Sequence, residues 1–239
     1  MKKGLIISLL LIASLMTFAQ NQARPQWNSV TSNNPGSFKI QLVASSESSI
    51  RVNVQVPGFF TTHVNTPMGE AEVISMPKAV NTLNAGDPDL PMIAIPAIIG
   101  DDAQMNVSVQ SVSYTDFEGI EVAPSKGDFP RSIDPASVPY TYGEAYQRNA
   151  FFPEVTVGLY EPYILRDFRG QNIVVYPFAY NPVTKTLRVY HDMTVVMYKE
   201  GQGGANIIEN RRSNVVKIDP DFRAPAGGNT TGSRCPCGC

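Results

Sequence analysis

The residue types that could support catalysis are scarce in this sequence. It has two histidines, His63 and His191, and three cysteines that lie among the last five residues, Cys235, Cys237 and Cys239. A cysteine nucleophile needs a histidine held within hydrogen-bond reach by a rigid scaffold, and the glycine- and proline-rich end of the chain supplies none. Neither histidine lies in a recognised catalytic motif, and serine-hydrolase, zinc-protease and phosphate-loop signatures are missing. We therefore predict that the chain is not an enzyme.

The cysteine cluster at the end of the chain could chelate a soft metal ion, since thiolates prefer such ions. Three thiols without a fourth ligand make a poor structural zinc site, however. The alternatives are oxidised cysteines in a flexible tail, or cysteines that only mark where this chain stops. The carboxylate pairs Asp101–Asp102 and Asp87–Asp89 are expected in turns and not as an acid and a base. The sequence predicts neither a metal site nor a cofactor.

One basic side chain is placed where it could bind another protein. Residues 123–152 are rich in proline, glycine and aromatic rings and have no regular periodicity, which predicts a long irregular loop. Loops of this length within a domain are often functional. Arg131 lies near its start, between Pro130 and Ser132, and an arginine on an extended, proline-stiffened loop suits a trypsin-like pocket. The alternative is an ordinary solvated arginine.

The start of the chain has the pattern of a secretory signal peptide. Lys2 and Lys3 precede a short apolar run that ends before Ala19, and this run is shorter than the roughly 20 residues of a membrane span. We expect residues 1–19 to be removed and the rest, which has no second segment of membrane length, to be secreted to the periplasm or the extracellular space. Nineteen basic and twenty-one acidic residues nearly balance, so no nucleic-acid partner is expected.

Most of the remaining sequence is a succession of short segments with strand character. Ile50, Val52 and Val54 alternate with polar residues, as in a strand with one buried face. Turn residues at 180–187 indicate a hairpin, and no window has helical periodicity. The sequence predicts an all-β domain, an antiparallel β-sandwich or jelly-roll-like fold, over residues 38–200, with a loose arm at 20–37 and a flexible tail at 201–239. Its strands are expected at 38–44, 49–56, 71–76, 92–99, 105–112, 120–122, 155–159, 164–167, 172–180 and 187–198.

Several short blocks of the sequence resemble the propeptide of the gingipain-type cysteine proteases, peptidase family C25. They follow one another in the order of the family between about residues 38 and 200. The blocks are GDPDLP at 86–91, APSKG at 123–127, DP, VPY and YG within 134–143, ILRD and RGQ within 164–171, and the hairpin YNPVTKTLRVY at 180–190.

The resemblance implies an all-β propeptide of a secreted zymogen, which assists folding of a cysteine endopeptidase domain and blocks its active-site cleft. In the family, a basic residue three positions before an Asp-Pro pair occupies the S1 pocket of the protease. Here that residue is Arg131, followed by Asp134 and Pro135, which implies an arginine-specific partner. A buried guanidinium needs a bidentate carboxylate, and lysine would not satisfy the same geometry. The side chains expected to bind the protease beside Arg131 are Asp134 and the aromatic Phe129, Tyr140 and Tyr142.

The chain departs from the family at its end, where the zymogens continue into a catalytic domain and this sequence stops in a glycine- and cysteine-rich tail. It is therefore either a stand-alone propeptide-like protein that acts in trans or the front of a longer precursor that acts in cis. A surface or adhesion β-sandwich attached through its tail is a further alternative, in which Arg131 has no role. A protease could cut the tail at four arginines, Arg211, Arg212, Arg223 and Arg234. The alternative is that these are ordinary solvated charges.

Overall fold

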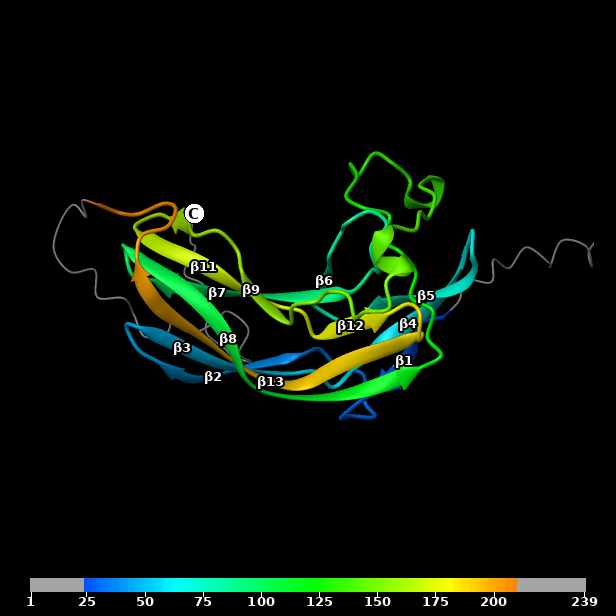
Figure 1. Ribbon diagram of the computed structural model, residues 1–239, viewed down its shortest axis with the longest axis horizontal. Helices are drawn as coiled ribbons and strands as arrows, with labels where there is room; N and C mark the ends of the chain where they lie inside the picture. The colour runs from blue at the N-terminus through cyan, green and yellow to red at the C-terminus, as the bar shows by residue number, and fades with distance from the viewer. Residues whose placement is uncertain (1–23, 210–239) are drawn as a thin grey trace, which may run out of the picture.

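The computed structural model describes residues 24–209, which contain thirteen strands, two short 3-10 helices and no α-helix (Figure 1). No helix in this range is long and apolar enough to cross a membrane. The elements are β1 (Gln26–Ser29), β2 (Lys39–Ser45), β3 (Ser49–Gln55), β4 (Gly58–Thr66), β5 (Gly69–Ser75), β6 (Val80–Asn81), β7 (Pro91–Ile99), β8 (Ala103–Glu118), η1 (Pro135–Ser137), η2 (Glu144–Gln147), β9 (Val157–Leu159), β10 (Tyr163–Leu165), β11 (Phe168–Val175), β12 (Phe178–Asn181) and β13 (Thr186–Gln202).

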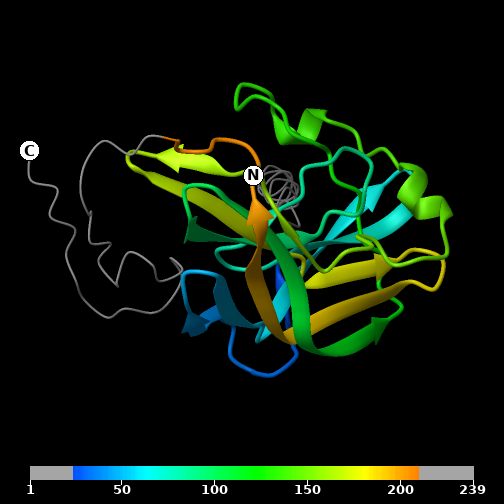
Figure 2. The ribbon, with the colours of Figure 1, turned by 60° about the vertical axis from the view of Figure 1, so that its left-hand side comes forward.

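Strand β13 is the centre of one five-stranded sheet. Its first part pairs with β12 and its later part with β3, while β8 pairs along its whole other side and β2 pairs with β3. A second sheet has the order β10-β11-β7-β6 with β9 beside β11, and a third joins β1, β4 and β5. The β7–β11 sheet lies over the β13 sheet (Figures 1 and 2). All strand pairs are antiparallel, so the predicted antiparallel all-β fold is confirmed.

The core fills the space between the two larger sheets. Val52 and Val195 are paired across β3 and β13 and are fully buried, and so are Ile95 and Ile173, which are paired across β7 and β11. Side chains along a strand alternate between its two faces, which is why the alternation read from residues 49–56 predicts the buried face of β3 correctly. Each fully buried aliphatic side chain stabilises the fold by about 1.5–3 kcal/mol.

The segment predicted as a loose arm contributes a strand. Residues 26–29 form β1, which pairs with β4, a strand that was not among those predicted. The Trp27 ring meets Phe60 edge-on with 5.0 Å between ring centroids, and its Nε1 donates a hydrogen bond to the Ser32 carbonyl. The polar composition of this segment hides its strand character, because the pairing depends on ring packing with a distant part of the chain.

Other strand ends also differ from those predicted. The expected strand at 172–180 is divided into β11 and β12 around Pro177, which has no N–H to donate to a sheet. The expected strand at 120–122 is reduced to a single parallel bridge between Val122 and Glu72. Strands β8 and β13 are longer than predicted, and irregularities interrupt their pairing at three places. Such bulges break the alternation from which strand ends are predicted.

Candidate functional site

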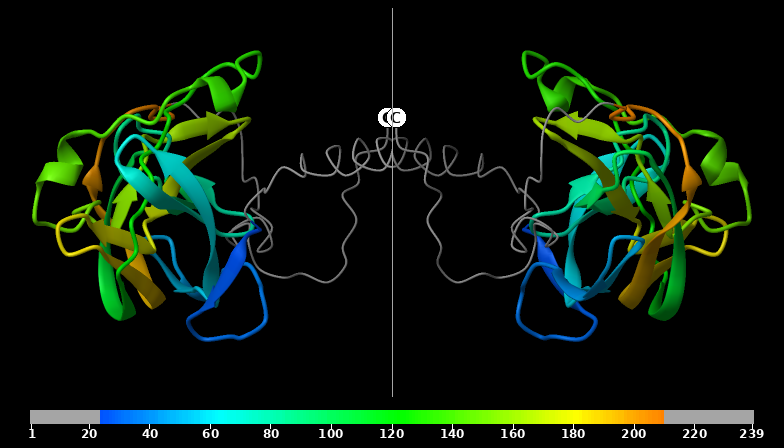
Figure 3. Two further views of the ribbon diagram at one scale, coloured as in Figure 1. Left: turned by 90° about the vertical axis from the view of Figure 1, so that its right-hand side faces the viewer. Right: turned by 90° about the vertical axis from the view of Figure 1, so that its left-hand side faces the viewer.

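Residues 123–152 lie between β8 and β9, and the middle of this segment projects beyond the sheets (Figures 1 and 3). We call this segment the loop, and divide it into an outgoing limb (residues 123–129), an apex (130–137) and a return limb (138–152). Helix η1 lies in the apex and η2 in the return limb. The prediction of a long irregular segment here agrees with the structure.

The outgoing limb is fixed to the body by backbone hydrogen bonds. The Ala123 N–H donates to the Glu72 carbonyl at 2.9 Å, and the Ala123 carbonyl accepts from the Asp89 N–H at 3.1 Å. The Ser125 N–H donates to the Asp87 carbonyl at 2.8 Å, and both Ala123 and Ser125 are buried. The start of the loop is therefore held between β5 and the turn that precedes β7.

The return limb is fixed by tyrosine side chains. The hydroxyl of Tyr142 lies 2.7 Å from the Thr66 hydroxyl at the end of β4, and its ring meets the Tyr146 ring edge-on at 4.6 Å. The Tyr146 hydroxyl donates to the Val122 carbonyl at 2.8 Å, and its ring contacts that of Tyr180. These contacts connect the return limb with both the β4–β5 hairpin and the residue that precedes the outgoing limb.

Burial keeps the tyrosine hydroxyls at the base of the loop protonated. It is the main reason that the pKa values of Tyr146 and Tyr180 are raised far above the usual range, with the neighbouring hydroxyls and carboxylates acting in the same direction. The pKa of Asp89 is also raised, because burial disfavours its charged form more than the Asn81 side chain favours it. The hydrogen bond from Tyr146 to Val122 is thus insensitive to physiological changes of pH.

The end of the return limb is held by Arg188 of β13. Its guanidinium lies over the rings of Tyr114 and Phe151, at 4.0 and 4.3 Å from the ring centroids. It also donates two hydrogen bonds of 2.8 Å to the Asp116 carboxylate, which lowers the pKa of that carboxyl. Phe151 therefore packs against Arg188 on the β8–β13 pair. Both ends of the loop are thus held by contacts with the sheets.

The apex presents Arg131. The Ile133 N–H donates to the Pro130 carbonyl at 2.9 Å, so Arg131 is the second residue of a β-turn and does not have the extended backbone expected. Asp134 caps η1 by accepting a hydrogen bond from the Ala136 N–H at 2.9 Å. Arg131 is exposed and makes no hydrogen bond or ion pair with any residue that the structure describes. Its guanidinium is available to a partner.

The aromatic residues predicted to surround Arg131 are placed differently from one another. Phe129 is half-buried, Tyr140 lies beneath the ammonium of Lys126, and Tyr142 contacts Thr66. In the described part of the chain, no hydrogen bond or ring contact joins any of them to Arg131. The predicted processing arginines and the three cysteines lie outside the described residues.

Sequence reasoning did not single out three residues that hold the loop. These are Thr66, Lys126 and Tyr146. The one available signal was the APSKG block at 123–127, which contains Lys126. The contacts of the other two depend on the path of the chain in space.

The two histidines lie in different strands. His63 is exposed on β4, with Nδ1 3.8 Å from Oε1 of Glu72, and His191 lies in β13. Among residues 24–209, no three potential metal ligands of the histidine, cysteine, aspartate and glutamate types are grouped together.

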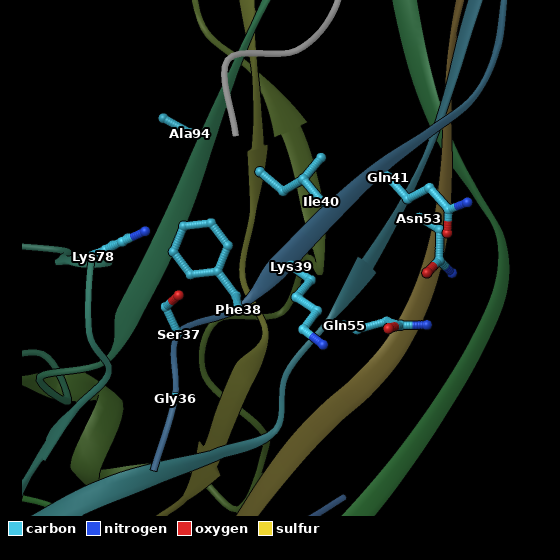
Figure 4. A pocket seen from close by; sticks show the side chains of 10 residues that line it. All are labelled: Gly36, Ser37, Phe38, Lys39, Ile40, Gln41, Asn53, Gln55, Lys78 and Ala94. Carbon is cyan, nitrogen blue, oxygen red and sulfur yellow. The ribbon is translucent and has the colours of Figure 1, made fainter. Parts of the chain in front are cut away.

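A surface cavity of about 560 Å³ lies away from the loop (Figure 4). It is lined by residues 36–38, by residues of β2 and β3 and by Lys78 and Ala94, and no loop residue takes part. Asn53, one of its polar groups, donates to the Asp192 carboxylate at 2.7 Å within the domain. A cavity of about 170 Å³ beside the return limb is lined by four charged and four apolar residues, and two of the charged ones, Arg148 and Glu144, form an ion pair. Neither contains a residue predicted to act on a partner.

Comparison with known proteins identifies relatives of one kind. The family model Propeptide_C25 matches residues 28–223. Gingipain R1 of Porphyromonas gingivalis is 37% identical over 173 residues, which are 72% of this chain and 18% of that protein. Gingipain R2 of the same species is 34% identical over 213 residues, 87% of this chain and 28% of that protein. The chain thus spans less than a third of the length of these relatives.

Two solved structures have a similar fold. A structure described as the complex of Porphyromonas gingivalis RgpB pro- and mature domains superposes with a TM-score of 0.69 and 34% identity, over 72% of this chain and 90% of that chain. A structure described as an insight into the zymogenic latency of gingipain K from the same organism gives a TM-score of 0.62 over 74% of this chain and 100% of that one. At 21% identity, the second comparison supports the fold alone.

Proposed function

Because the chain belongs to the Propeptide_C25 family, we propose that it binds and inhibits an arginine-specific cysteine protease of the C25 type, with the side chain of Arg131 in the S1 pocket. It also assists folding of that catalytic domain, in cis or in trans, and is exported by its predicted leader. The family is one of propeptides, and the chain's own role is binding and not peptide hydrolysis.

The observation that carries this proposal is an exposed, unpaired arginine at the tip of an anchored loop. Arg131 has no partner to give up within residues 24–209, while both limbs beside it are fixed by hydrogen bonds and ring contacts. A loop that is ordered before binding loses little conformational entropy on association. A guanidinium that enters a closed pocket opposite a carboxylate forms a bidentate, charge-assisted pair, the kind of contact that dominates binding energy.

Inhibition of an arginine-specific C25 protease tests the proposal directly. Residues 20–239, which lack only the predicted leader, would be compared with the Arg131→Ala and Arg131→Lys variants. Arg131→Ala is expected to raise the inhibition constant by at least about 30-fold, since truncating one partner of a desolvated charge pair costs about 2–5 kcal/mol. Arg131→Lys should also weaken inhibition, because an ammonium cannot form the bidentate contact.

Arg166→Ala is the matched control, because Arg166 is also exposed and lies in the β10–β11 turn, outside the loop. It should inhibit as the unsubstituted chain does. Equal inhibition by Arg131→Ala would assign the anchor to another residue, and no inhibition by the unsubstituted chain would contradict the proposed function. Recovery of activity when the denatured catalytic domain is refolded with and without the chain measures the folding role.

A further inference from the structure

One side chain closes the loop on itself next to Arg131. Lys126, in the outgoing limb, donates from Nζ to the Pro135 carbonyl at 2.7 Å and lies 4.4 Å from the centroid of the Tyr140 ring. Pro135 belongs to the apex and Tyr140 to the return limb. In the part of the chain that the structure describes, no other hydrogen bond or ring contact connects the two sides of the loop between residues 126 and 140. The closure of the loop at this point therefore depends on Lys126.

The residues that Lys126 contacts belong to the same unit as Arg131. Pro135 is the first residue of η1, whose capping residue Asp134 follows the Arg131 turn by one position. An ammonium-to-carbonyl hydrogen bond is charge-assisted, and the face of a tyrosine ring attracts a cation. Lys126 thus fixes η1, and through it the turn that carries Arg131, relative to the anchored outgoing limb.

We propose that Lys126 is the positioning residue that makes this loop an inhibitor instead of a substrate. This inference rests on the proposed function, because it concerns a loop that occupies a protease active site. Hydrolysis requires the scissile carbonyl carbon about 3–3.5 Å from the nucleophile and correctly oriented. An apex held in a β-turn admits the Arg131 side chain to the pocket and keeps its carbonyl away from that position.

Without this support the apex can extend and be cut as an ordinary substrate. The cysteine thiolate of the protease adds to the Arg131 carbonyl carbon, and the bond to the Ser132 nitrogen breaks as that nitrogen takes up a proton. Water then hydrolyses the thioester, which returns the cysteine and leaves a carboxylate on Arg131. The two fragments together weigh one water molecule more than the intact chain, which mass spectrometry detects.

The test compares Lys126→Met, Lys126→Arg and Lys39→Met in the chain that lacks only the predicted leader. Lys126→Met keeps the aliphatic stem and removes the ammonium, whereas Lys126→Arg keeps a cation that can reach both contacts. Lys39→Met is the matched control, because Lys39 is exposed on β2, which lies at the opposite side of the molecule from the loop (Figure 1). Each variant is incubated with an arginine-specific C25 protease, and both the inhibition constant and the rate of cleavage after Arg131 are measured.

Lys126→Met is expected to be cleaved after Arg131 at least about tenfold faster than the unsubstituted chain, with weaker inhibition, since small losses of positioning change rates by such factors. Lys126→Arg and Lys39→Met should be cleaved after Arg131 as slowly as the unsubstituted chain, and the fragment masses distinguish that cut from any cut after the arginine introduced at position 126. Inhibition and cleavage by Lys126→Met that match those of Lys39→Met would overturn the inference while the proposed function stands. If the unsubstituted chain does not inhibit at all, the proposed function fails, and this inference fails with it.

A second variant keeps the test valid if Lys126→Met does not fold, as thermal unfolding would show. Tyr140→Leu removes only the ring beneath the ammonium and leaves the hydrogen bond to Pro135 in place. It should accelerate cleavage after Arg131 in the same direction and by a smaller factor. A Tyr140→Leu protein that is folded and cleaved no faster than the unsubstituted chain would count against the inference.

Discussion

Arg131 differs from its polar neighbours in the loop, whose side chains have hydrogen-bond partners within the domain. Asp134 and Lys126 are hydrogen-bonded to backbone groups of the loop, and Tyr142 lies against Thr66 of β4. Arg131 has no such partner in the described part of the chain. The shape of the loop therefore depends on Lys126, Asp134 and Tyr142, whereas the charge exposed at its apex is that of Arg131. Substitutions can alter one without the other.

Asp89, beneath the loop, makes stability depend on pH. Its Oδ1 is buried without a hydrogen-bond partner, and burial raises its pKa above the ordinary 3.8. Below pH 3.8 the carboxyl is neutral in both the folded and the unfolded chain. As the pH rises from there to the folded-state pKa, the unfolded chain ionises while the folded chain keeps its proton, so unfolding becomes more favourable. The contribution of Asp89 to stability is thus full in acid and is lost toward neutral pH.

Asp89→Asn should remove this loss. The variant is expected to have a higher free energy of unfolding than the unsubstituted chain at pH 7, with the difference disappearing below about pH 4. Urea unfolding at both pH values measures it. Asp134→Asn is the control, since asparagine caps a helix about as well as aspartate. A lower stability of Asp89→Asn at pH 7 would show that the buried carboxylate is stabilising.

At the scale of the elements, the position of β1 beside β4 requires a glycine at position 58. Gly58 faces Asn28 and the Trp27 ring so closely that an added Cβ would overlap the Asn28 carbonyl oxygen and ring atoms of Trp27. Backbone on one side and a packed indole on the other leave no room for relaxation. Any larger residue at position 58 must therefore displace β1 from β4.

Gly58→Ala is expected to detach β1 and to expose Trp27. Because Trp27 is the only tryptophan of the chain, its fluorescence reports on this strand, and its emission should move to longer wavelength with greater quenching by acrylamide. Gly158→Ala in β9 is the matched control, since a Cβ there meets nothing within 4 Å. Unchanged emission in Gly58→Ala would mean that β4 can shift to accommodate the methyl group.

The elements that could be predicted from sequence are those whose burial follows a local pattern. Residues 49–56 alternate, and β3 is found there with Val52 and Val54 inside. Strand β1 could not be predicted, because its polar residues pair only once Gly58 and Phe60 are placed beside them. Prediction fails where a strand depends on a distant contact instead of its own composition.

The same division applies to the loop. Arg131 could be proposed from its position before Asp134 and Pro135 within a recognisable block of sequence. The contact of Lys126 with Pro135 and Tyr140 depends on a turn and a short helix between them, which no local pattern specifies. For the same reason the sequence does not reveal the partners of Tyr140 and Tyr142, which are Lys126 and Thr66.

At the scale of the whole molecule, a buried arginine connects three parts of the chain: β11, the β7–β8 turn and the segment that follows β13. Arg169 of β11 is fully buried. It donates hydrogen bonds to the carbonyls of Gly100, which follows β7, and Ala103, the first residue of β8, and to those of Gly203 and Ala205, which follow β13. A planar guanidinium with five N–H groups suits four carbonyls in this way, and lysine does not.

Arg169→Met should release the segment after β13 and lower the free energy of unfolding by at least about 2 kcal/mol, because buried carbonyls lose their donors. Hydrogen exchange at the amides of Gly203 and Ile208, which are bonded to Asp102 and Asp101, is expected to accelerate before the rest of the fold is affected. Arg166→Met, three positions away and exposed, serves as the control. Unchanged protection of both amides would show that the segment is held by its backbone contacts alone.

The position of β13 in the chain also determines when the domain can fold. It is the last strand described, yet β12, β3 and β8 all pair with it, and the pairing of Ser49 with Tyr198 spans most of the domain. Contacts between residues so far apart in sequence make folding slow, on the order of milliseconds to seconds. During synthesis, β8 has no strand partner within the described residues until residue 186 has been added. The sheet that contains β2, β3, β8 and β12 is therefore completed late, when its last strand has been synthesised.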